Sequence, residues 1–318
     1  MKTRKLGWTG VELTTIGLGT WAMGGSGWQF SWGPQDDAQS IGAIRRAIDR
    51  GINWIDTAPA YGLGHSEEIV GRAVRAMAGR PFIATKCSRV WDERGTLGSN
   101  LKADSIQREA EASLRRLQVD VIDLYQIHWA MPDEDIEEGW SAVAGLIRQG
   151  KVRYGGVSNF SISQLERIRK IHPIASVQPP YSMLVRGIEQ DLLAYCAAHN
   201  IGVVCYSPMY KGLLTGRFDR ERLQRLAEDD HRRKDPRFQE PQISANLKLV
   251  EDLSPLVRQE GRTLGELAIA WVLRRPEVTS AIVGARSAEQ VDEFVAAGDW
   301  SLPAELESRI ERLLAQPA

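Results

Sequence analysis

Residues 51–62 read GINWIDTAPAYG, and this stretch decides the fold of the chain. It opens on a short apolar, strand-like run, Ile52 to Ile55, that ends at the carboxylate of Asp56. The next segment, Ser66 to Met77, carries apolar residues at helical spacing. A buried strand that ends in an ionisable residue and is followed by a helix is typical of one βα unit in a parallel sheet.

The same unit recurs along the chain. The predicted strands are Thr15 to Leu18, Ile52 to Ile55, Pro81 to Ala84, Val121 to Ile127, Val152 to Gly156, Ser176 to Val177, Gly202 to Tyr206 and Ser280 to Val283. The first predicted helices are Asp37 to Arg50, Ser66 to Met77, Ser105 to Leu117, Asp135 to Gln149 and Ser161 to Ile171, and a helix follows each later strand. Eight βα units predict an α/β fold, a (β/α)8 TIM barrel, with a doubly wound open sheet as the alternative.

The two ends and the seventh connection depart from this rhythm. Lys2 to Leu6 and Val11 to Leu13 flank a turn and predict an N-terminal β-hairpin that closes the bottom of the barrel. Barrels of this length usually form one domain, so we expect residues 1–318 to be a single domain. The connection Met209 to Pro241 is long and highly charged, which indicates either a functional lid or a solvated surface segment.

The composition excludes several classes of partner. With 40 Lys and Arg against 41 Asp and Glu, the formal net charge is −1, so nothing favours binding to nucleic acid or to a membrane surface. The 3 cysteines show no CxxC spacing, which favours a reducing compartment. No apolar run has the length of a signal peptide or a membrane span. We therefore expect a cytoplasmic protein that acts on a small molecule.

Two motifs match known sites in their letters but lack the required context. Gly17 to Ala22 fits the dinucleotide fingerprint GxGxxA, but a glycine-rich loop follows it where the fingerprint requires a helix. His65-Ser66-Glu67 fits the HxE of zinc deaminases, but the PCxxC partner is absent. The sequence therefore predicts neither a Rossmann domain nor a metal site.

Four polar residues, Asp56, Tyr61, Lys86 and His128, lie at or just after the ends of three predicted strands. The ends of parallel barrel strands meet on one face, so these side chains are expected to form one site. Tyr61 is the candidate acid, with a pKa lowered by Lys86, while Asp56 would hold the lysine and His128 would orient a substrate oxygen. Taken singly, each residue could instead be a turn cap, a packed aromatic, a surface charge or a strand-end histidine.

At these residues the chain resembles the aldo-keto reductases. The matching motifs are Gly51 to Gly62, Thr85-Lys86, Asp123 to His128, Gly156 to Phe160, Gln178 to Ser182, Tyr206 to Pro208, Gly212 to Gly216 and Ile282 to Ser287. They follow the family's order over nearly the whole chain, and they are most similar to the bacterial branch that includes general-stress reductases. The resemblance implies hydride transfer between NADPH/NADP+ and a carbonyl or alcohol, with the four polar residues as the catalytic set.

The resemblance also implies a coenzyme site. It assigns Ser158, Asn159 and Gln178 to the nicotinamide carboxamide, Tyr206 to the nicotinamide ring and Arg286 with Ser287 to the 2′-phosphate. The full expected set is Thr20, Trp21, Asp56, Ser158, Asn159, Gln178, Tyr206, Ser207, Pro208, Gly212, Leu213, Gly284, Arg286, Ser287 and Gln290. In the alternative interpretation, Ser287 is an ordinary helix N-cap and Arg286 a surface residue.

Aromatic residues in the loops that follow strands suggest the shape of the substrate site. These residues are Trp21, Trp28, Trp32, Trp91 and Trp129. With polar neighbours such as Gln29, Asp92 and Arg94, they would suit sugars or hydroxy-carbonyls, or they form the core of the loops. Two other functions stay open: a nucleotide-binding, redox-sensing subunit of the same fold, and a barrel isomerase or lyase.

Overall fold

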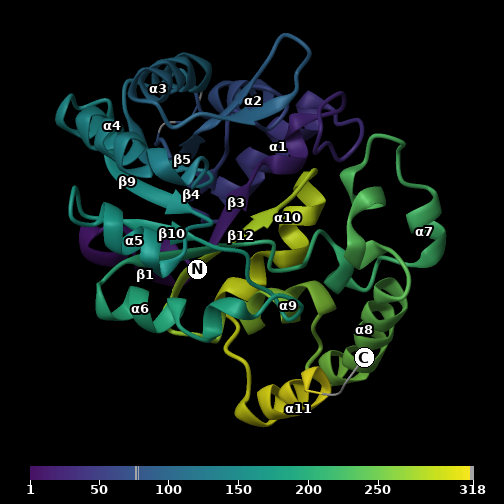
Figure 1. The fold of residues 1–318 in the computed structure, drawn as a ribbon. Coiled ribbons are helices and arrows are strands. Elements are labelled where there is room, and N and C mark those ends of the chain that lie inside the picture. The colour runs from purple at the N-terminus through teal and green to yellow at the C-terminus, as the bar shows by residue number, and fades with distance from the viewer. Residues whose placement is uncertain (76, 78, 316–318) are drawn as a thin grey trace.

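The computed structural model describes residues 1–75, 77 and 79–315, and its centre is a closed barrel of eight parallel strands (Figure 1). Around the barrel the strands are β3 (Ile16–Gly19), β4 (Trp54–Asp56), β5 (Phe82–Cys87), β8 (Ile122–Ile127), β9 (Val152–Ser158), β10 (Ser176–Gln178), β11 (Gly202–Tyr206) and β12 (Val278–Gly284). Pairing of β12 with β3 closes the ring. The predicted (β/α)8 barrel is confirmed, and the open sheet is excluded.

Helices surround the barrel, as each βα unit predicts. They are α1 (Asp37–Asp49), α2 (His65–Val74), α3 (Ala103–Leu117), α4 (Ile136–Arg148), α5 (Ile162–Ile168), α6 (Leu192–Ala198), α7 (Arg220–Gln224), α8 (Gln242–Gln259), α9 (Leu264–Leu273), α10 (Ala288–Phe294) and α11 (Ala304–Leu314). The predicted helix Ser66 to Met77 ends at Val74, and residue 76 of that prediction lies outside the described residues. Capping residues stabilise the first turn of several helices. Ser161, for example, is the N-cap of α5 and forms a capping box with Gln164.

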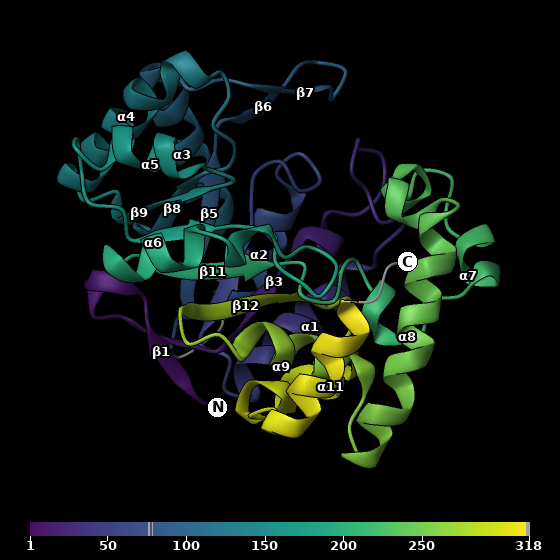
Figure 2. The ribbon, with the colours of Figure 1, turned by 60° about the horizontal axis from the view of Figure 1, so that its bottom comes forward.

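The N-terminal hairpin closes one end of the barrel. Its strands β1 (Thr3–Lys5) and β2 (Glu12–Thr14) pair antiparallel. Leu6 and Leu13 are fully buried, and they pack with the barrel residues Trp54, Leu124 and Val204. In Figure 2 the purple β1 lies at the end of the barrel opposite a second hairpin, β6 (Arg89–Trp91) and β7 (Leu97–Ser99). The N-terminal hairpin is confirmed, whereas the second hairpin was not predicted.

Packing inside the barrel explains the glycine motif Gly17 to Ala22, which begins within β3. A Cβ atom at Gly17 would lie 2.0 Å from the Trp54 side chain, so glycine is required there by packing inside the barrel. After β3 the chain forms a short 3-10 turn, Trp21–Gly24, and reaches a helix only at Asp37. No helix N-terminus directly follows this motif, so it is not a dinucleotide fingerprint.

The connection after β11 is an ordered segment with a small core of its own. Leu213, Phe218, Phe238 and Ile243 are buried together. In Figures 1 and 2 this green segment lies beside the purple loop that follows β3, at the mouth of the barrel. Short 3-10 turns complete the connections: η1 (Gly7–Thr9), η2 (Trp21–Gly24), η3 (Asp133–Asp135), η4 (Gly187–Glu189), η5 (Leu213–Thr215), η6 (His231–Lys234), η7 (Pro236–Phe238) and η8 (Val295–Asp299).

Candidate active site

The carboxyl ends of the barrel strands open into a cavity of about 1370 Å³. Asp56 is the last residue of β4, Lys86 is the last but one of β5, and His128 directly follows β8. Tyr61 lies in the turn between β4 and α2. Parallel strands therefore bring together residues that are 72 positions apart in the sequence, from Asp56 to His128.

Lys86 is the centre of the hydrogen-bond network at the base of the cavity. Its Nζ lies 2.7 Å from Asp56 Oδ2, 2.9 Å from the Thr57 carbonyl oxygen and 3.3 Å from the Tyr61 hydroxyl. An ammonium has three donors, so all of them have a partner here. Burial lowers the pKa of Lys86, and the Asp56 carboxylate opposes that shift. The lysine is thus held in one position with its charge directed at Tyr61.

Hydrogen bonds also hold the second carboxylate oxygen of Asp56. Its Oδ1 accepts hydrogen bonds from Gln178 Nε2 at 2.8 Å and from Gln126 Nε2 at 3.4 Å. Gln126 was missed at the sequence level, although alternation along a strand puts residue 126 on the same face as residue 128. Gln178 is a predicted coenzyme-binding residue, and in the structure its side chain braces this carboxylate.

Tyr61 keeps its proton in this site. Burial raises the pKa of Tyr61 well above 10, and the Asp56 carboxylate adds to the shift. The expectation that Lys86 lowers this pKa is therefore not met, because Asp56 offsets the ammonium charge and the phenolate would be desolvated. One lone pair of the hydroxyl accepts the Lys86 hydrogen bond, which leaves the O–H free to donate to a ligand in the cavity.

His128 is neutral and lies against Tyr61. The two ring centroids are 5.9 Å apart in an edge-on arrangement. Burial lowers the pKa of His128 well below 6.5, and the charges of Lys86 and Arg89 add to this effect. Its Nδ1 is buried and has no hydrogen-bond partner among the described residues. A neutral imidazole has one N–H donor, which suits the orientation of a substrate oxygen.

Two buried residues of α2 support the site from behind. Ser66 bonds Thr20 Oγ1 at 2.7 Å and Thr57 Oγ1 at 3.1 Å, so it ties the ends of β3 and β4 together. Glu67 accepts from Thr85 at 2.6 Å and pairs with Arg116 at 2.6 Å. The His65-Ser66-Glu67 motif therefore has a structural role here. Among the described residues, no group of three or more His, Cys, Asp or Glu side chains could hold a metal ion.

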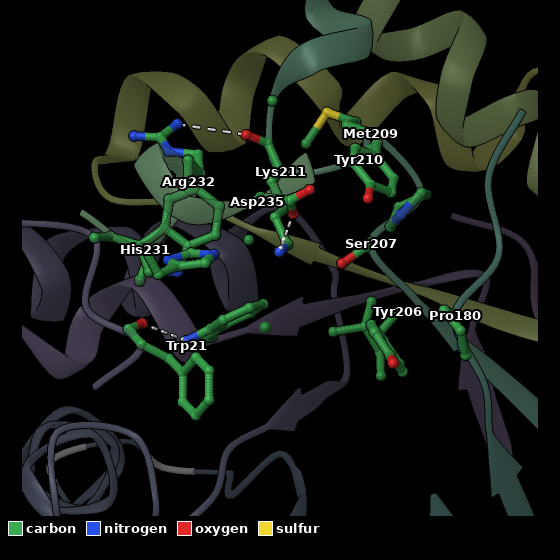
Figure 3. A pocket seen from close by; sticks show the side chains of 18 of the residues that line it. Trp21, Pro180, Tyr206, Ser207, Met209, Tyr210, Lys211, His231, Arg232 and Asp235 are labelled. Carbon is green, nitrogen blue, oxygen red and sulfur yellow. Dashed lines mark hydrogen bonds and ion pairs between the residues drawn. The ribbon is translucent and has the colours of Figure 1, made fainter. Parts of the chain in front are cut away.

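A second network lines the cavity at β9, β10 and β11. Ser158 Oγ donates to the Gln178 carbonyl oxygen at 2.8 Å, and Asn159 Nδ2 donates to Ser158 Oγ at 3.0 Å. The Tyr206 hydroxyl donates to Asn159 Oδ1 at 2.9 Å. Figure 3 shows Tyr206 and Ser207 at the wall of the cavity. The three predicted amide and hydroxyl residues are thus adjacent, next to one aromatic ring.

Most of the sequence-predicted site residues line this one cavity. Those in its wall are Thr20, Trp21, Asp56, Tyr61, His128, Ser158, Asn159, Gln178, Tyr206, Ser207, Pro208, Gly212, Gly284, Arg286 and Gln290. The other three do not line it. Lys86 is buried behind Asp56 and Tyr61, Leu213 is in the small core of the seventh connection, and the Ser287 side chain caps α10.

The loop 20–36 and the segment 207–241 hold each other across one side of the cavity, and we call this pair the strap. The Ser31 carbonyl accepts from the His231 main chain at 3.0 Å, and Ser31 Oγ donates to Asp229 Oδ2 at 2.8 Å. The His231 ring stacks on Trp21 with the ring centroids 4.8 Å apart (Figure 3). It also meets Trp32 edge-on, with the centroids 4.9 Å apart. His231 belongs to the charged connection Met209 to Pro241, for which the sequence left a functional lid and a solvated surface segment open.

The strap is expected to loosen in acid. Burial lowers the pKa of His231 to about 4, against 6.5 for an unperturbed histidine. His231 therefore binds a proton more readily in the open strap than in the closed strap. The stability that neutral His231 gives to the closed strap is fully present above pH ~6.5, and up to about 3 kcal/mol of it is lost as the pH falls towards ~4. Hydrogen exchange of residues 20–36 and 207–241, corrected for intrinsic rates, should increase between pH ~7.5 and pH ~5.

His231→Phe is the control for this experiment, because phenylalanine keeps the stacking ring and cannot titrate. Its strap should show much less change over the same pH interval. An equal response in the variant and in the original chain would show that another group controls the loosening.

The described part of the chain contains no helix that combines the length and the apolar character needed to cross a membrane.

Comparison with known proteins gives one consistent result. The model of the Aldo/keto reductase family matches residues 15–315. The chain is 40% identical to Aldo-keto reductase YhdN of Bacillus subtilis, over 96% of this chain and 91% of that protein. It is 35% identical to the NADH-specific methylglyoxal reductase of Escherichia coli, over 98% of this chain and 100% of that protein.

Two solved structures extend the likeness to the whole fold. The glycerol dehydrogenase of Gluconobacter oxydans superposes with a TM-score of 0.88 at 39% identity, covering 98% of this chain and 94% of that one. An aldo-keto reductase of Klebsiella pneumoniae, solved in complex with NADPH, gives a TM-score of 0.76 at 31% identity and covers 100% and 96% of the two chains.

Proposed function

The chain belongs to the aldo/keto reductase family, and we propose that it reduces the carbonyl group of an aldehyde or ketone with NADPH. One observation carries the proposal: a protonated tyrosine at the base of the cavity is bonded to a buried lysine that a carboxylate holds in place. In the proposed reaction the bound coenzyme supplies a hydride to the carbonyl carbon.

The side chains would handle the proton. Tyr61 donates its phenolic proton to the carbonyl oxygen as the negative charge develops there, and the resulting phenolate lies 3.3 Å from the Lys86 ammonium. His128 donates a hydrogen bond to the same oxygen and orients it. Asp56 keeps the lysine charged despite its burial. In the reverse direction, the phenolate would accept the proton of an alcohol.

The cavity has the groups that a nicotinamide dinucleotide requires. Ser158, Asn159 and Gln178 provide hydroxyl and amide groups for a carboxamide, and Tyr206 provides a flat ring beside them. Gly212 has a φ of 89°, in the left-handed region, so its backbone can approach a pyrophosphate without a side chain in the way. These features support the proposed coenzyme site.

The proposal is tested by coenzyme oxidation with a panel of carbonyl compounds: short aldehydes, methylglyoxal, sugars and keto-glycosides. NADPH-dependent turnover of one or more of them is expected. If apolar aryl aldehydes are better substrates than every hydroxylated carbonyl, the interpretation of the loop tryptophans as a site for sugars or hydroxy-carbonyls is wrong. Absence of turnover with all of them, despite tight NADPH binding, would instead favour a nucleotide-binding regulatory subunit.

We further propose that the chain works as one domain over residues 1–318. The β12–β3 pairing joins the last barrel strand to the first. The barrel therefore closes only when the N-terminal and the C-terminal parts of the chain fold together.

Arg286→Ala should weaken NADPH binding by about 10- to 100-fold and change NADH binding little, because a planar guanidinium forms charge-assisted hydrogen bonds to a phosphate. Arg286 lines the cavity, and its Nε donates to Gln35 Oε1 at 2.5 Å. The measurement is the dissociation constant of each coenzyme. Equal losses for the two coenzymes would refute a 2′-phosphate role and leave Arg286 as a brace of the strap.

A further inference from the structure

Arg89 is a cation in the cavity wall without an acidic partner. It begins β6 and lines the cavity, and it forms no ion pair with any carboxylate of the described chain. Its one side-chain hydrogen bond to the described residues goes from Nη1 to Ser99 Oγ at 2.8 Å, across the β6–β7 hairpin. Burial lowers the pKa of this guanidinium, and no neighbouring carboxylate offsets the shift. A partly buried charge with most of its donors free is costly unless a ligand completes it.

Five of the six acidic residues in the cavity wall have partners elsewhere in the described chain. Asp56 pairs with Lys86, Asp230 with Arg232, Asp235 with Lys211 and Glu293 with Arg217, while Asp229 accepts from Ser31. Glu228 also lines the cavity and belongs to the strap, not to the wall around Arg89. None of these carboxylates neutralises Arg89.

The topology separates Arg89 from the other cations of the cavity. The other cationic side chains of the cavity wall after β11 all belong to the strap segment: Lys211, Arg217, Arg222, Arg232, Lys234 and Arg237. Arg286 follows β12. In the closed barrel β5 lies four strands from β11 in both directions, so the loop after β5 emerges on the opposite side. In Figure 2 the β6–β7 hairpin stands apart from α7 and α8. Arg89 is therefore on the side of the cavity that lies away from the coenzyme residues of β11 and β12.

Local contacts bring Arg89 close to the reacting centre. The His128 main chain donates to the Cys87 carbonyl at 3.1 Å, and Ser88 Oγ donates to the Trp129 carbonyl at 3.3 Å. Ser88 is buried and has a φ of 73°, a conformation rare for a residue with a side chain. This turn redirects the chain directly before Arg89, and strain of this kind is concentrated at functional sites.

We propose that Arg89 binds an anionic group of the substrate, so that the enzyme acts on short carbonyl compounds that carry a carboxylate or a phosphate. This inference rests on the proposed reductase function and adds the substrate class. A guanidinium fork binds either anion through paired hydrogen bonds. His128 and Tyr61 would hold the carbonyl oxygen, and Arg89 would fix the other end of the molecule.

The test compares matched substrates with NADPH: succinic semialdehyde against butanal, and glyceraldehyde 3-phosphate against glyceraldehyde. The original enzyme should have the higher kcat/KM for at least one anionic member, and which pair shows the preference tells a carboxylate from a phosphate. Arg89→Gln should lower kcat/KM for that anion by about 10- to 100-fold, mainly through KM, and change the neutral partner by less than about threefold. Arg89→Lys should recover part of the loss.

Arg45→Gln is the matched control, because Arg45 is exposed on α1, outside the cavity wall, and loses the same charge. This variant should change kcat/KM by no more than about twofold for any of the substrates. If Arg89→Gln affects anionic and neutral substrates equally, Arg89 only braces the hairpin through Ser99, and the inference is wrong. Turnover of neutral carbonyls without any preference for anionic ones would overturn this inference but leave the proposed reductase function intact. Absence of turnover with every carbonyl would refute the reductase function itself.

Discussion

Tyr61→Phe is expected to lower kcat by about 10³- to 10⁴-fold and to leave the NADPH dissociation constant within about twofold. The variant removes the one hydroxyl that is bonded to the Lys86 ammonium and faces the cavity. Phenylalanine keeps the ring that packs against Trp21 and His128. The hydride could still be positioned, but no proton would be delivered to the oxygen. Single-turnover oxidation of NADPH and a coenzyme titration measure the two quantities.

Tyr154→Phe is the matched control. Tyr154 loses an equivalent hydroxyl at the closed end of the barrel, where it bonds the Thr9 carbonyl, so its kcat should stay within about twofold. Little change of kcat in Tyr61→Phe would exclude Tyr61 as the acid and would favour a barrel isomerase or lyase. A redox-sensing subunit would keep its partner function in the Tyr61 variant.

The barrel could be predicted because its strands are encoded locally. Val121 to Ile127 was expected to be a strand, and β8 covers Ile122–Ile127. A buried parallel strand needs a short apolar run, and such a run is visible in a single sequence. The convergence of Asp56, Lys86 and His128 followed from topology, since the ends of parallel strands meet on one face. The roles given to these residues are still proposals.

The strap could not be predicted, because its contacts join residues 200 positions apart that show no periodic pattern. Ser31 and His231 are an example, since each is an ordinary polar residue in an irregular segment. Arg89 is similar: a positive φ at Ser88 and a two-stranded hairpin aim it at the cavity, and neither feature has a strong signal in the sequence. Irregular loops depend on tertiary contacts, and these determine the shape of the site.

Lys86→Met should lower the free energy of unfolding by about 3–5 kcal/mol, besides abolishing turnover. The Asp56–Lys86 pair is almost completely excluded from solvent, so removal of the ammonium leaves the carboxylate buried with only glutamine donors. Urea unfolding measures the loss. The exposed pair Arg108–Asp104 is the control, and Arg108→Met should cost less than about 1 kcal/mol.

The combination Asp56→Asn with Lys86→Met separates the charge effect from lost packing. Removal of both charges leaves no unpaired ion. The asparagine Oδ1 can still accept the hydrogen bond that Gln178 donates to Asp56 Oδ1 at 2.8 Å in the original chain. The double variant should recover more than half of the stability that Lys86→Met loses, while remaining inactive. If it is as unstable as the single variant, the loss came from a cavity in the core and not from the buried charge. If both variants lose less than about 1 kcal/mol, the pair is not desolvated, and the site holds Lys86 only loosely.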